Sequence, residues 1–277
     1  MRLADRLIGT RTASIQRDRA KLVNGGTMAD EAGGEVKSFR RRRCLITGCA
    51  VAAWLYANAA VASELELYTG VAVDTHGQGY EYVGLGAGQA VNDRWTFMGK
   101  IIGNFLHYEY ESGSRDIRAR APGVRIQIGP KYFTEGRYFI LTAGLDYRNT
   151  SLSRSDPKSD TQGARTGGTI EAIYSQDMSR RFTTDLILSY SSIGNFTWGR
   201  GRLKYLTSFE PASHRIFVGF EGIGQGNSDY TAQQVGPIIE LQRFKQPFSI
   251  VLSAGYKHSS TFSHSGYFGL EIYHKIW

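Results

Sequence analysis

The chain has 277 residues, with 33 Lys and Arg, 25 Asp and Glu, and a formal net charge of +8 at pH 7. Residues 1–62 hold 11 of the basic and 5 of the acidic residues, so residues 63–277 keep 22 and 20 and are almost neutral, which excludes the basic footprint of a nucleic-acid-binding protein. Both cysteines, Cys44 and Cys49, also precede residue 63, which excludes a small fold held by disulfides for the rest of the chain.

An export signal is predicted before residue 63. Four arginines at 40–43 precede an apolar run that is densest from Cys44 to about Ala57 and that ends in small residues. A positive region, a short apolar region and a small-x-small site, in this order, form a secretory signal peptide. We expect cleavage between Ala62 and Ser63. The expected parts are a polar N-terminal extension at 1–37, the signal peptide at 38–62 and the mature domain at 63–277.

Two alternatives to a cleaved signal fit these residues less well. Thr47 and Asn58 interrupt the run of about 20 apolar residues that an uncleaved spanning helix needs. The lipoprotein-like stretch at 46–49 follows the arginines too closely to leave an apolar region before its cut. The leader is therefore set aside from the fold, and Met28 is a second candidate start codon.

Residues 63–277 alternate between apolar and polar side chains with a period of two, which is the signature of β-strands. In the stretch 182–191, for example, Phe182, Leu186 and Leu188 share one face and Asp185 lies on the other. Segments of this kind are predicted near 64–74, 79–91, 94–110, 121–134, 137–149, 165–177, 181–192, 195–209, 214–225, 232–243, 247–258 and 265–277.

The twelve segments and their connections favour a membrane-spanning barrel. Most segments exceed the strands of an ordinary globular protein and match the 9–11 residues of a tilted transmembrane strand. Short and long connections largely alternate, as they do between the periplasmic turns and outer loops of such barrels. The expected fold is an all-β, antiparallel up-and-down transmembrane β-barrel with twelve strands; the alternative is a soluble β-sandwich. A closed sheet leaves no backbone group without a partner in lipid.

Aromatic residues near the strand ends are expected to form two interfacial girdles. The chain ends on Trp277, as outer-membrane barrels typically end on an aromatic residue, although Trp277 is one residue out of phase with the apolar face of the last strand. The expected girdle residues are Tyr68, Tyr80, Tyr82, Trp95, Tyr108, Tyr132, Tyr138, Tyr147, Tyr190, Tyr256, Tyr267 and Tyr273.

The opposite faces of the strands carry charges of both signs, which are expected to line the lumen. Either these charges fill a narrow lumen as ion pairs, or they line a water-filled conduit. Barrels of eight strands are filled by side chains and barrels of sixteen strands enclose a channel, so a count of twelve leaves both alternatives open. The expected inward residues are Glu66, Asp74, Lys100, Arg125, Asp146, Arg148, Glu171, Asp185, Arg200, Arg202, Lys204, Glu221, Glu240 and Lys257.

The segment 195–209 carries the strongest candidate site. Trp198, Arg200, Arg202 and Lys204 share its inward face, with glycines opposite. Such a basic ladder needs carboxylates, which neighbouring strands offer in the residues Glu171, Asp185 and Glu221. Structural pairing is the simpler interpretation, and a binding track for a sugar or an anion, with stacking on the tryptophan, is the functional one. The full set of candidate lumen and substrate contacts is Trp198, Arg200, Arg202, Lys204, Glu171, Asp185, Glu221, Asp146 and Arg148.

Catalysis and metal binding find little support. The cluster His258, Ser260, His264 and Ser265 would have to supply a nucleophile, a base and an orienting group, but it falls in a predicted loop without a fitting third partner. The six histidines are scattered, without the spacing of metal ligands. We expect no catalytic residue, no metal and no cofactor.

Four stretches resemble the BcsS-type cellulose biosynthesis proteins, and the resemblance extends over most of the mature domain. The resemblance implies an outer-membrane barrel associated with the export of bacterial cellulose, which acts as a conduit or an anchor rather than an enzyme. Its expected partners are outer-membrane lipid, a β-glucan and components of a cellulose synthase complex. A small-solute channel and a lipid-modifying enzyme are the alternatives. The resembling stretches are residues 143–172, 189–205, 217–239 and 252–259.

Overall fold

The computed structural model describes residues 62–113, 115–156, 159, 161–208, 214–228, 230–243 and 247–276. The predicted polar extension, the predicted signal peptide up to Val61 and Trp277 lie outside these ranges. Twelve β-strands make up nearly all of the described chain. They are β1 Glu64–Asp74, β2 Gly79–Ala90, β3 Trp95–Ser112, β4 Arg115–Thr134, β5 Arg137–Leu152, β6 Gly163–Asp177, β7 Phe182–Ser191, β8 Phe196–Leu206, β9 His214–Gly226, β10 Thr231–Arg243, β11 Phe248–Ser259 and β12 Ser265–Lys275.

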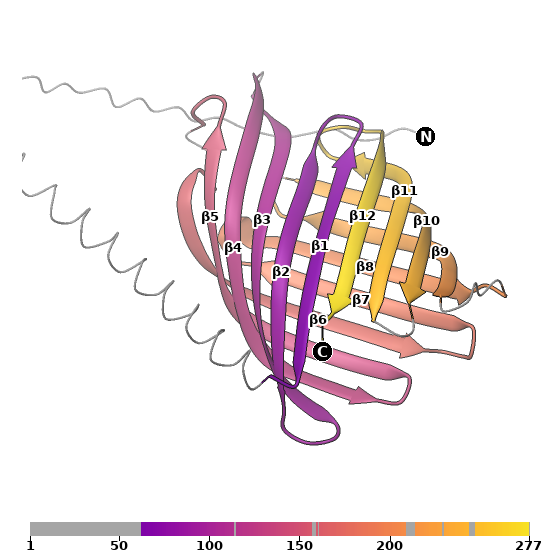
Figure 1. Cartoon of the computed structure of the whole chain (residues 1–277). Coiled ribbons are helices and arrows are strands. Elements are labelled where there is room, and N and C mark those ends of the chain that lie inside the picture. The colour runs from indigo at the N-terminus through magenta and orange to yellow at the C-terminus, as the bar shows by residue number, and fades with distance from the viewer. Residues whose placement is uncertain are drawn as a thin grey trace, which may run out of the picture. The chain divides into compact units, whose positions relative to one another are not determined.

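The strands close into a barrel in which each pairs antiparallel with its neighbours in sequence (Figure 1). The closure is made by β1 and β12, which pair from Glu66↔Lys275 to Asp74↔Tyr267. No edge strand remains in this sheet, so the backbone groups of the wall find partners within it, as hydrocarbon surroundings require. The predicted twelve-stranded up-and-down barrel is confirmed.

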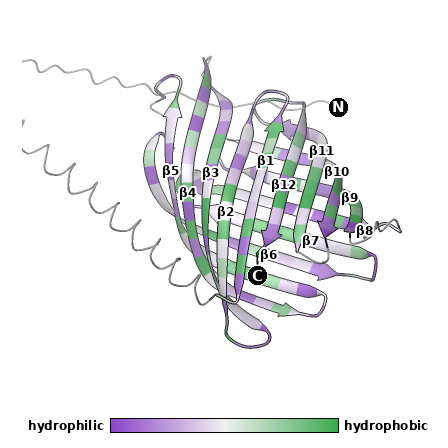
Figure 2. Cartoon of the chain, viewed as in Figure 1, coloured by the Kyte–Doolittle hydropathy of each residue, from purple (hydrophilic) through white to green (hydrophobic). Residues whose placement is uncertain are grey.

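Hydrophobic and hydrophilic residues alternate along the strands (Figure 2), and the two faces of the wall differ as expected of a transmembrane barrel. Outward-facing apolar residues are exposed, among them Leu188 at 61%, Phe220 at 67% and Val235 at 56%. Inward-facing charged residues such as Asp146 and Glu221 are buried at 0% and 2%. This inversion of the usual interior excludes the soluble sandwich. Among the described residues no helix is long and apolar enough to cross a membrane.

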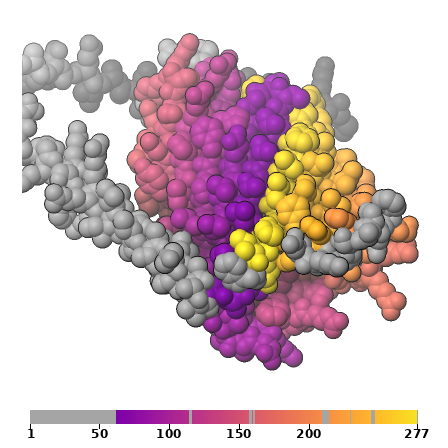
Figure 3. All heavy atoms as spheres, viewed as in Figure 1, coloured from indigo at the N-terminus to yellow at the C-terminus, as the bar shows by residue number. Residues whose placement is uncertain are grey.

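Three consecutive strands are longer than a membrane span requires. β3, β4 and β5 have 18, 20 and 16 residues, against about 9–11 for a tilted spanning strand. They rise on one side of the barrel, in magenta to salmon in Figures 1 and 3. The prediction of a long connection between the segments 94–110 and 121–134 was wrong, because the ladder between β3 and β4 continues to Ser112↔Arg115. The alternating charged residues between 111 and 120 lie on the hairpin of β3 and β4, which extends beyond the membrane-spanning part of the barrel.

The connection after β5 is attached to this raised hairpin. The hydroxyl of Tyr110 donates a hydrogen bond to Asp156 Oδ2 at 3.1 Å, and the N–H of Ser153 donates to the carbonyl of Arg118 at 2.8 Å. Burial and the Asp156 carboxylate raise the pKa of Tyr110 to about 12, against the opposing hydrogen bond of Ser159. The phenol therefore keeps its proton at neutral pH and remains a donor.

A close approach of β4 to β5 depends on glycine. A Cβ at Gly129 would lie 1.9 Å from the carbonyl oxygen of Leu141, and one at Gly144 would lie 1.8 Å from that of Ile126. No side chain can approach a neighbouring backbone so closely, so these two positions require glycine.

Candidate functional site in the lumen

The basic ladder predicted on β8 lies inside the barrel. Arg202 and Lys204 are buried at 7% and 6%, and the guanidinium of Arg200 lies 5.5 Å from the ring centroid of Trp198. On the outer side of the same strand, a Cβ at Gly199 would meet Leu188 of β7 at 2.9 Å. The expected one-faced arrangement of aromatic and basic side chains is therefore present.

Carboxylates from β9 and β12 neutralise the two arginines of the ladder. Arg202 contacts Glu221 at 2.8 Å and Glu271 at 2.9 Å, and Arg200 is paired with Glu271 as well. Tyr267 of β12 donates to Glu221 at 3.1 Å. These contacts join strands on different sides of the lumen, so they form a transverse strut.

The lysine of the ladder is equally well paired. Lys204 lies 2.7 Å from Asp185 and 2.8 Å from Glu240. Ser175 donates to Asp185 at 2.7 Å, and Ser249 donates to Glu240 at 2.7 Å. Each cation of the ladder thus has at least one carboxylate partner, and the carboxylates have further donors, which is the arrangement that makes buried charge tolerable.

The expected carboxylate partners were partly right. Asp185 and Glu221 pair with the ladder, but Glu171 pairs with Lys100 of β3 instead. The sequence analysis did not identify Glu271 as an inward residue. The signal for it was the parity of β12, because the outward residues Leu270 and Ile272 place the residue between them inside.

A second charged group surrounds Asp146 on β5. Its Oδ2 lies 3.3 Å from Arg148 and 3.6 Å from Arg125, and it accepts a hydrogen bond from Ser191 at 2.8 Å. Asp146 and Arg148 were both expected in the lumen, and the structure places them there in direct contact. One carboxylate here serves two guanidinium groups, which is a weaker neutralisation than on β8.

Ion pairs also lie at the two ends of the lumen. At the end that holds both termini of the barrel, Lys131 lies 2.7 Å from Glu64 and 3.2 Å from Glu66. At the other end, Lys257 lies 2.6 Å from Asp74. Among the described residues, these lumen ion pairs involve nine carboxylates and nine cations. The ion-paired lining is therefore electrically neutral.

The prediction of two aromatic girdles was wrong for more than half of its residues. Trp95, Tyr132, Tyr147, Tyr190 and Tyr256 face outward, and the rings of Trp95 and Tyr132 lie 4.8 Å apart. Seven tyrosines share the inward parity of their strands instead. These are Tyr68, Tyr80, Tyr82, Tyr108, Tyr138, Tyr267 and Tyr273.

Glycines opposite these tyrosines explain why they fit inside. A Cβ at Gly70 would lie 2.7 Å from the Tyr82 ring, and one at Gly84 would lie 2.2 Å from the Tyr68 ring. Large and small residues alternate between the neighbouring strands β1 and β2, so each ring can lie against the backbone of the adjacent strand. Outward-facing Val83 and Leu85 on β2 were the signal that Tyr80 and Tyr82 turn inward.

Polar groups without partners concentrate on one part of the lumen wall. Asn104 and Gln127 are buried at 7% and 1%, yet neither the oxygen nor the nitrogen of either carboxamide has a hydrogen-bond partner in the described structure. Sequence reasoning did not single out these two residues. In a sequence, an Asn or Gln that only packs inside the lumen cannot be distinguished from one that binds a ligand.

The residues of the histidine cluster are hydrogen-bonded to groups outside the cluster. In the described structure His258 is hydrogen-bonded to the carbonyl of Ser263, and Ser260 accepts the N–H of Thr231 at 3.1 Å, so the two do not contact each other through hydrogen bonds. The described residues also contain no group of three or more His, Cys, Asp or Glu able to hold a metal ion.

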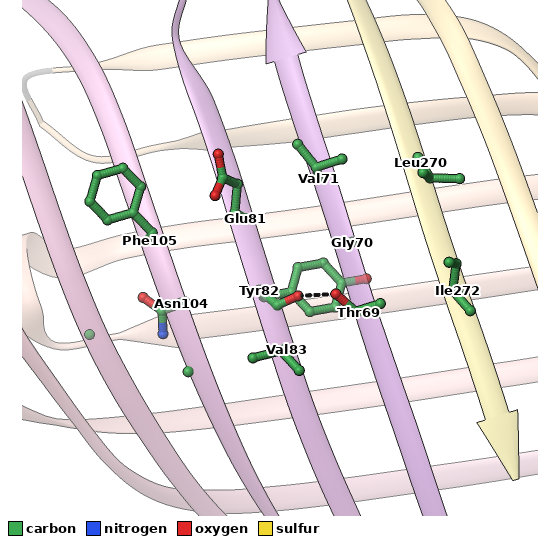
Figure 4. A pocket seen from close by; sticks show the side chains of 12 residues that line it. Thr69, Gly70, Val71, Glu81, Tyr82, Val83, Asn104, Phe105, Leu270 and Ile272 are labelled. Carbon is green, nitrogen blue, oxygen red and sulfur yellow. Dashed lines mark hydrogen bonds between the residues drawn. The ribbon is translucent and has the colours of Figure 1, made fainter.

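The outer face of the barrel has a shallow groove of about 510 Å³ over β1, β2, β3 and β12 (Figure 4). Val71, Val83, Phe105, Leu270 and Ile272 line it, and glycines form part of its floor. A groove with this lining on the outward face suits a lipid chain. The carboxylate of Glu81 is the charged group in its lining.

A family model and several solved structures are similar to this chain. The family model described as "Cellulose biosynthesis protein BcsS" matches residues 56–276. No curated protein sequence matches the chain. Among solved structures, the β domain of the Bordetella autotransporter BrkA is 11% identical, with a TM-score of 0.49 over 77% of this chain and 99% of that chain. LpxR from Salmonella typhimurium is 11% identical, with a TM-score of 0.43 over 76% and 99%. The NalP translocator domain from Neisseria meningitidis is 10% identical, with a TM-score of 0.41 over 86% and 97%.

Proposed function

The chain belongs to the BcsS family of cellulose biosynthesis proteins, and from this membership we propose that it serves cellulose export as an outer-membrane conduit or anchoring component. It is a barrel without catalytic activity in this proposal. The signal peptide at 38–62 directs it through the inner membrane and is removed. Its partners are outer-membrane lipid, the β-glucan and components of the cellulose synthase complex.

The neutral, hydroxyl-rich lining of the lumen is the observation that supports this proposal. Selective ion channels present rings of one charge, whereas here nine carboxylates and nine cations pair with one another. Seven inward tyrosines add amphipathic rings. A lining of this kind suits an uncharged polysaccharide better than a small ion.

Within this proposal, Trp198 contacts the glucan and the paired charges beside it hold the barrel in shape. The indole lies against Arg200 at 5.5 Å, which fixes its orientation. Glu171, Asp185, Glu221, Asp146 and Arg148 contact the glucan only through those oxygen and nitrogen atoms that their ion pairs leave available.

Deletion and complementation in the native bacterium test the proposal. We expect the deletion strain to synthesise glucan but to lose most of the cellulose on its surface, and wild-type protein to restore it. The double variant Trp198→Ala, Arg200→Ala should restore export only in part. Unchanged surface cellulose in the deletion strain, with ordinary single-channel conductance of small salts in planar bilayers, would instead identify a general solute channel.

A further inference from the structure

We propose that the inner wall formed by β3, β4 and β5, beside the tyrosines of β2, is the subsite that hydrogen-bonds the glucan. Asn104 and Gln127 are its principal contacts. This inference rests on the proposed function, and it differs from the sequence-based hypothesis, which assigned the substrate to the basic ladder of β8.

Unpartnered polar atoms identify this wall. The described structure has twelve buried side-chain nitrogen and oxygen atoms without a hydrogen bond, and ten of them lie on these three adjacent strands. Nine of the ten face the lumen, and the tenth, His107 Nδ1, has the outward parity of β3. Buried polar groups in native proteins almost always have a partner, so this wall is complete only when water or a ligand enters it. The nine atoms are Asn104 Oδ1 and Nδ2, Gln127 Oε1 and Nε2, Arg125 Nε, Thr142 Oγ1, Asp146 Oδ1, Arg148 Nε and Thr150 Oγ1.

The chemistry of these atoms indicates a neutral, hydroxyl-bearing ligand. Four are donors, three are acceptors, and the two threonine hydroxyls can act as either. An anion would be matched by donors alone and a cation by acceptors alone. A sugar hydroxyl both donates and accepts, so a glucan chain can satisfy such a mixed set along its length.

Tyrosines lie on the strand next to the unpartnered amide of Asn104. Tyr82 on β2 is paired in register with Asn104 on β3, and its ring extends over Gly70 on β1 (Figure 4). The rings of Tyr80 and Tyr82 lie 5.6 Å apart on the same face, and Tyr68 continues the row onto β1. Tyrosine combines an apolar ring with a polar edge, which suits the alternating apolar faces and hydroxyl edges of a sugar chain.

Access to the wall requires side-chain movement, and the residues present allow it. The nine atoms are closed to solvent in this packing, but Arg125 and Arg148 are long and flexible. Gly123 lies opposite Asn104, and Gly144 lies opposite Gln127, so no Cβ narrows these two positions. A glucan chain that displaces the two arginine side chains therefore meets both amides.

Cello-oligosaccharide binding by the protein purified from outer membranes in detergent tests the subsite. Asn104→Leu with Gln127→Met replaces both amides by apolar side chains of similar shape. We expect the double variant to lose about tenfold or more in affinity for cellohexaose, measured by calorimetry, a loss that corresponds to one or two hydrogen bonds. The matched control Gln234→Met changes a lumen carboxamide on β10, outside the wall, and should stay within about twofold of wild type.

The outcomes separate the subsite from the function. If wild-type protein binds cellohexaose and the double variant binds it equally well, the subsite is wrong and the proposed function stands. If wild-type protein does not bind cellohexaose and the deletion strain exports cellulose normally, the proposed function fails as well. Heat-modifiable migration on gels shows whether the double variant folds. If it folds poorly, the single variants Asn104→Leu and Gln127→Met are tested by the same calorimetric measurement.

Discussion

The lumen has two polar walls that differ in how many of their polar atoms have ion-pair or hydrogen-bond partners. On β8, β9 and β12, Arg202 has two carboxylate partners, and Glu221 accepts from both Arg202 and Tyr267. On β3, β4 and β5, Asp146 alone faces two guanidinium groups, and both carboxamides of Asn104 and Gln127 are unpartnered. The first wall carries more charge, and the second has more unused hydrogen-bonding capacity.

This difference separates structural polar groups from groups available to a ligand. A buried charge with complete partners holds strands in place and has nothing left for a substrate. A buried amide without partners adds no stability, and its retention is explained by an interaction that the isolated barrel does not contain. The number of charges on a strand is therefore a poorer indicator of a binding site than the number of its unsatisfied atoms.

The largest effect is expected from breaking the complete wall. Glu221→Gln removes the negative charge beside Arg202 and weakens the acceptor of Tyr267, so the variant should lose about 3 kcal/mol of stability, as broken buried pairs do. Urea-induced unfolding in lipid vesicles measures the loss. Glu81→Gln, an outward carboxylate with no ion pair in the described structure, should change stability by less than about 0.5 kcal/mol. Equal effects of the two variants would show that the strut has no structural role.

The close approach of β4 and β5 within the second wall gives the next effect. Gly144→Ala places a Cβ 1.8 Å from the carbonyl oxygen of Ile126, so β4 and β5 must separate, at a cost of about 2 kcal/mol. Gly168→Ala on β6 is the matched control, because nothing lies within 4 Å of its Cβ. The same unfolding experiment compares the two. An alanine tolerated equally well at both positions would contradict the requirement for glycine at position 144.

The sequence was sufficient for the barrel and for part of the first wall. Strict alternation predicted the strand faces, and strand order then placed Asp185 and Glu221 beside the ladder. Glu271 was missed because it reaches Arg200 and Arg202 from a strand that is not their neighbour, and such a contact depends on the width of the lumen. The tyrosines were misassigned because aromatic rings suit both a lipid interface and a narrow interior. Only the parity of neighbours such as Val83 distinguishes the two.

Removal of polar groups from the second wall should not lower the stability of the barrel, in contrast to the first wall. In the absence of glucan, Asn104→Leu with Gln127→Met removes four unpartnered atoms, so the protein should unfold at an unchanged or slightly higher urea concentration, with a gain of up to about 1 kcal/mol. Its comparison with Glu221→Gln contrasts the two walls directly. A loss of more than about 1 kcal/mol would mean that the amides have structural partners, and would remove the distinction between the walls.

The smallest effect concerns the outer end of the second wall, where Tyr110 attaches the connection after β5. Tyr110→Phe removes the hydrogen bond to Asp156, worth about 1 kcal/mol locally, so protease cleavage between β5 and β6 should become a few-fold faster. Tyr108→Phe is the control, because the Tyr108 hydroxyl makes no hydrogen bond with the described residues. The pKa of Tyr110 is raised from 10.0 to about 12, so its contribution is complete below about pH 10 and is lost as the pH rises through 12. Cleavage of the wild-type protein should thus be constant between pH 7 and 9, and a rise within that range would show that another group attaches the connection.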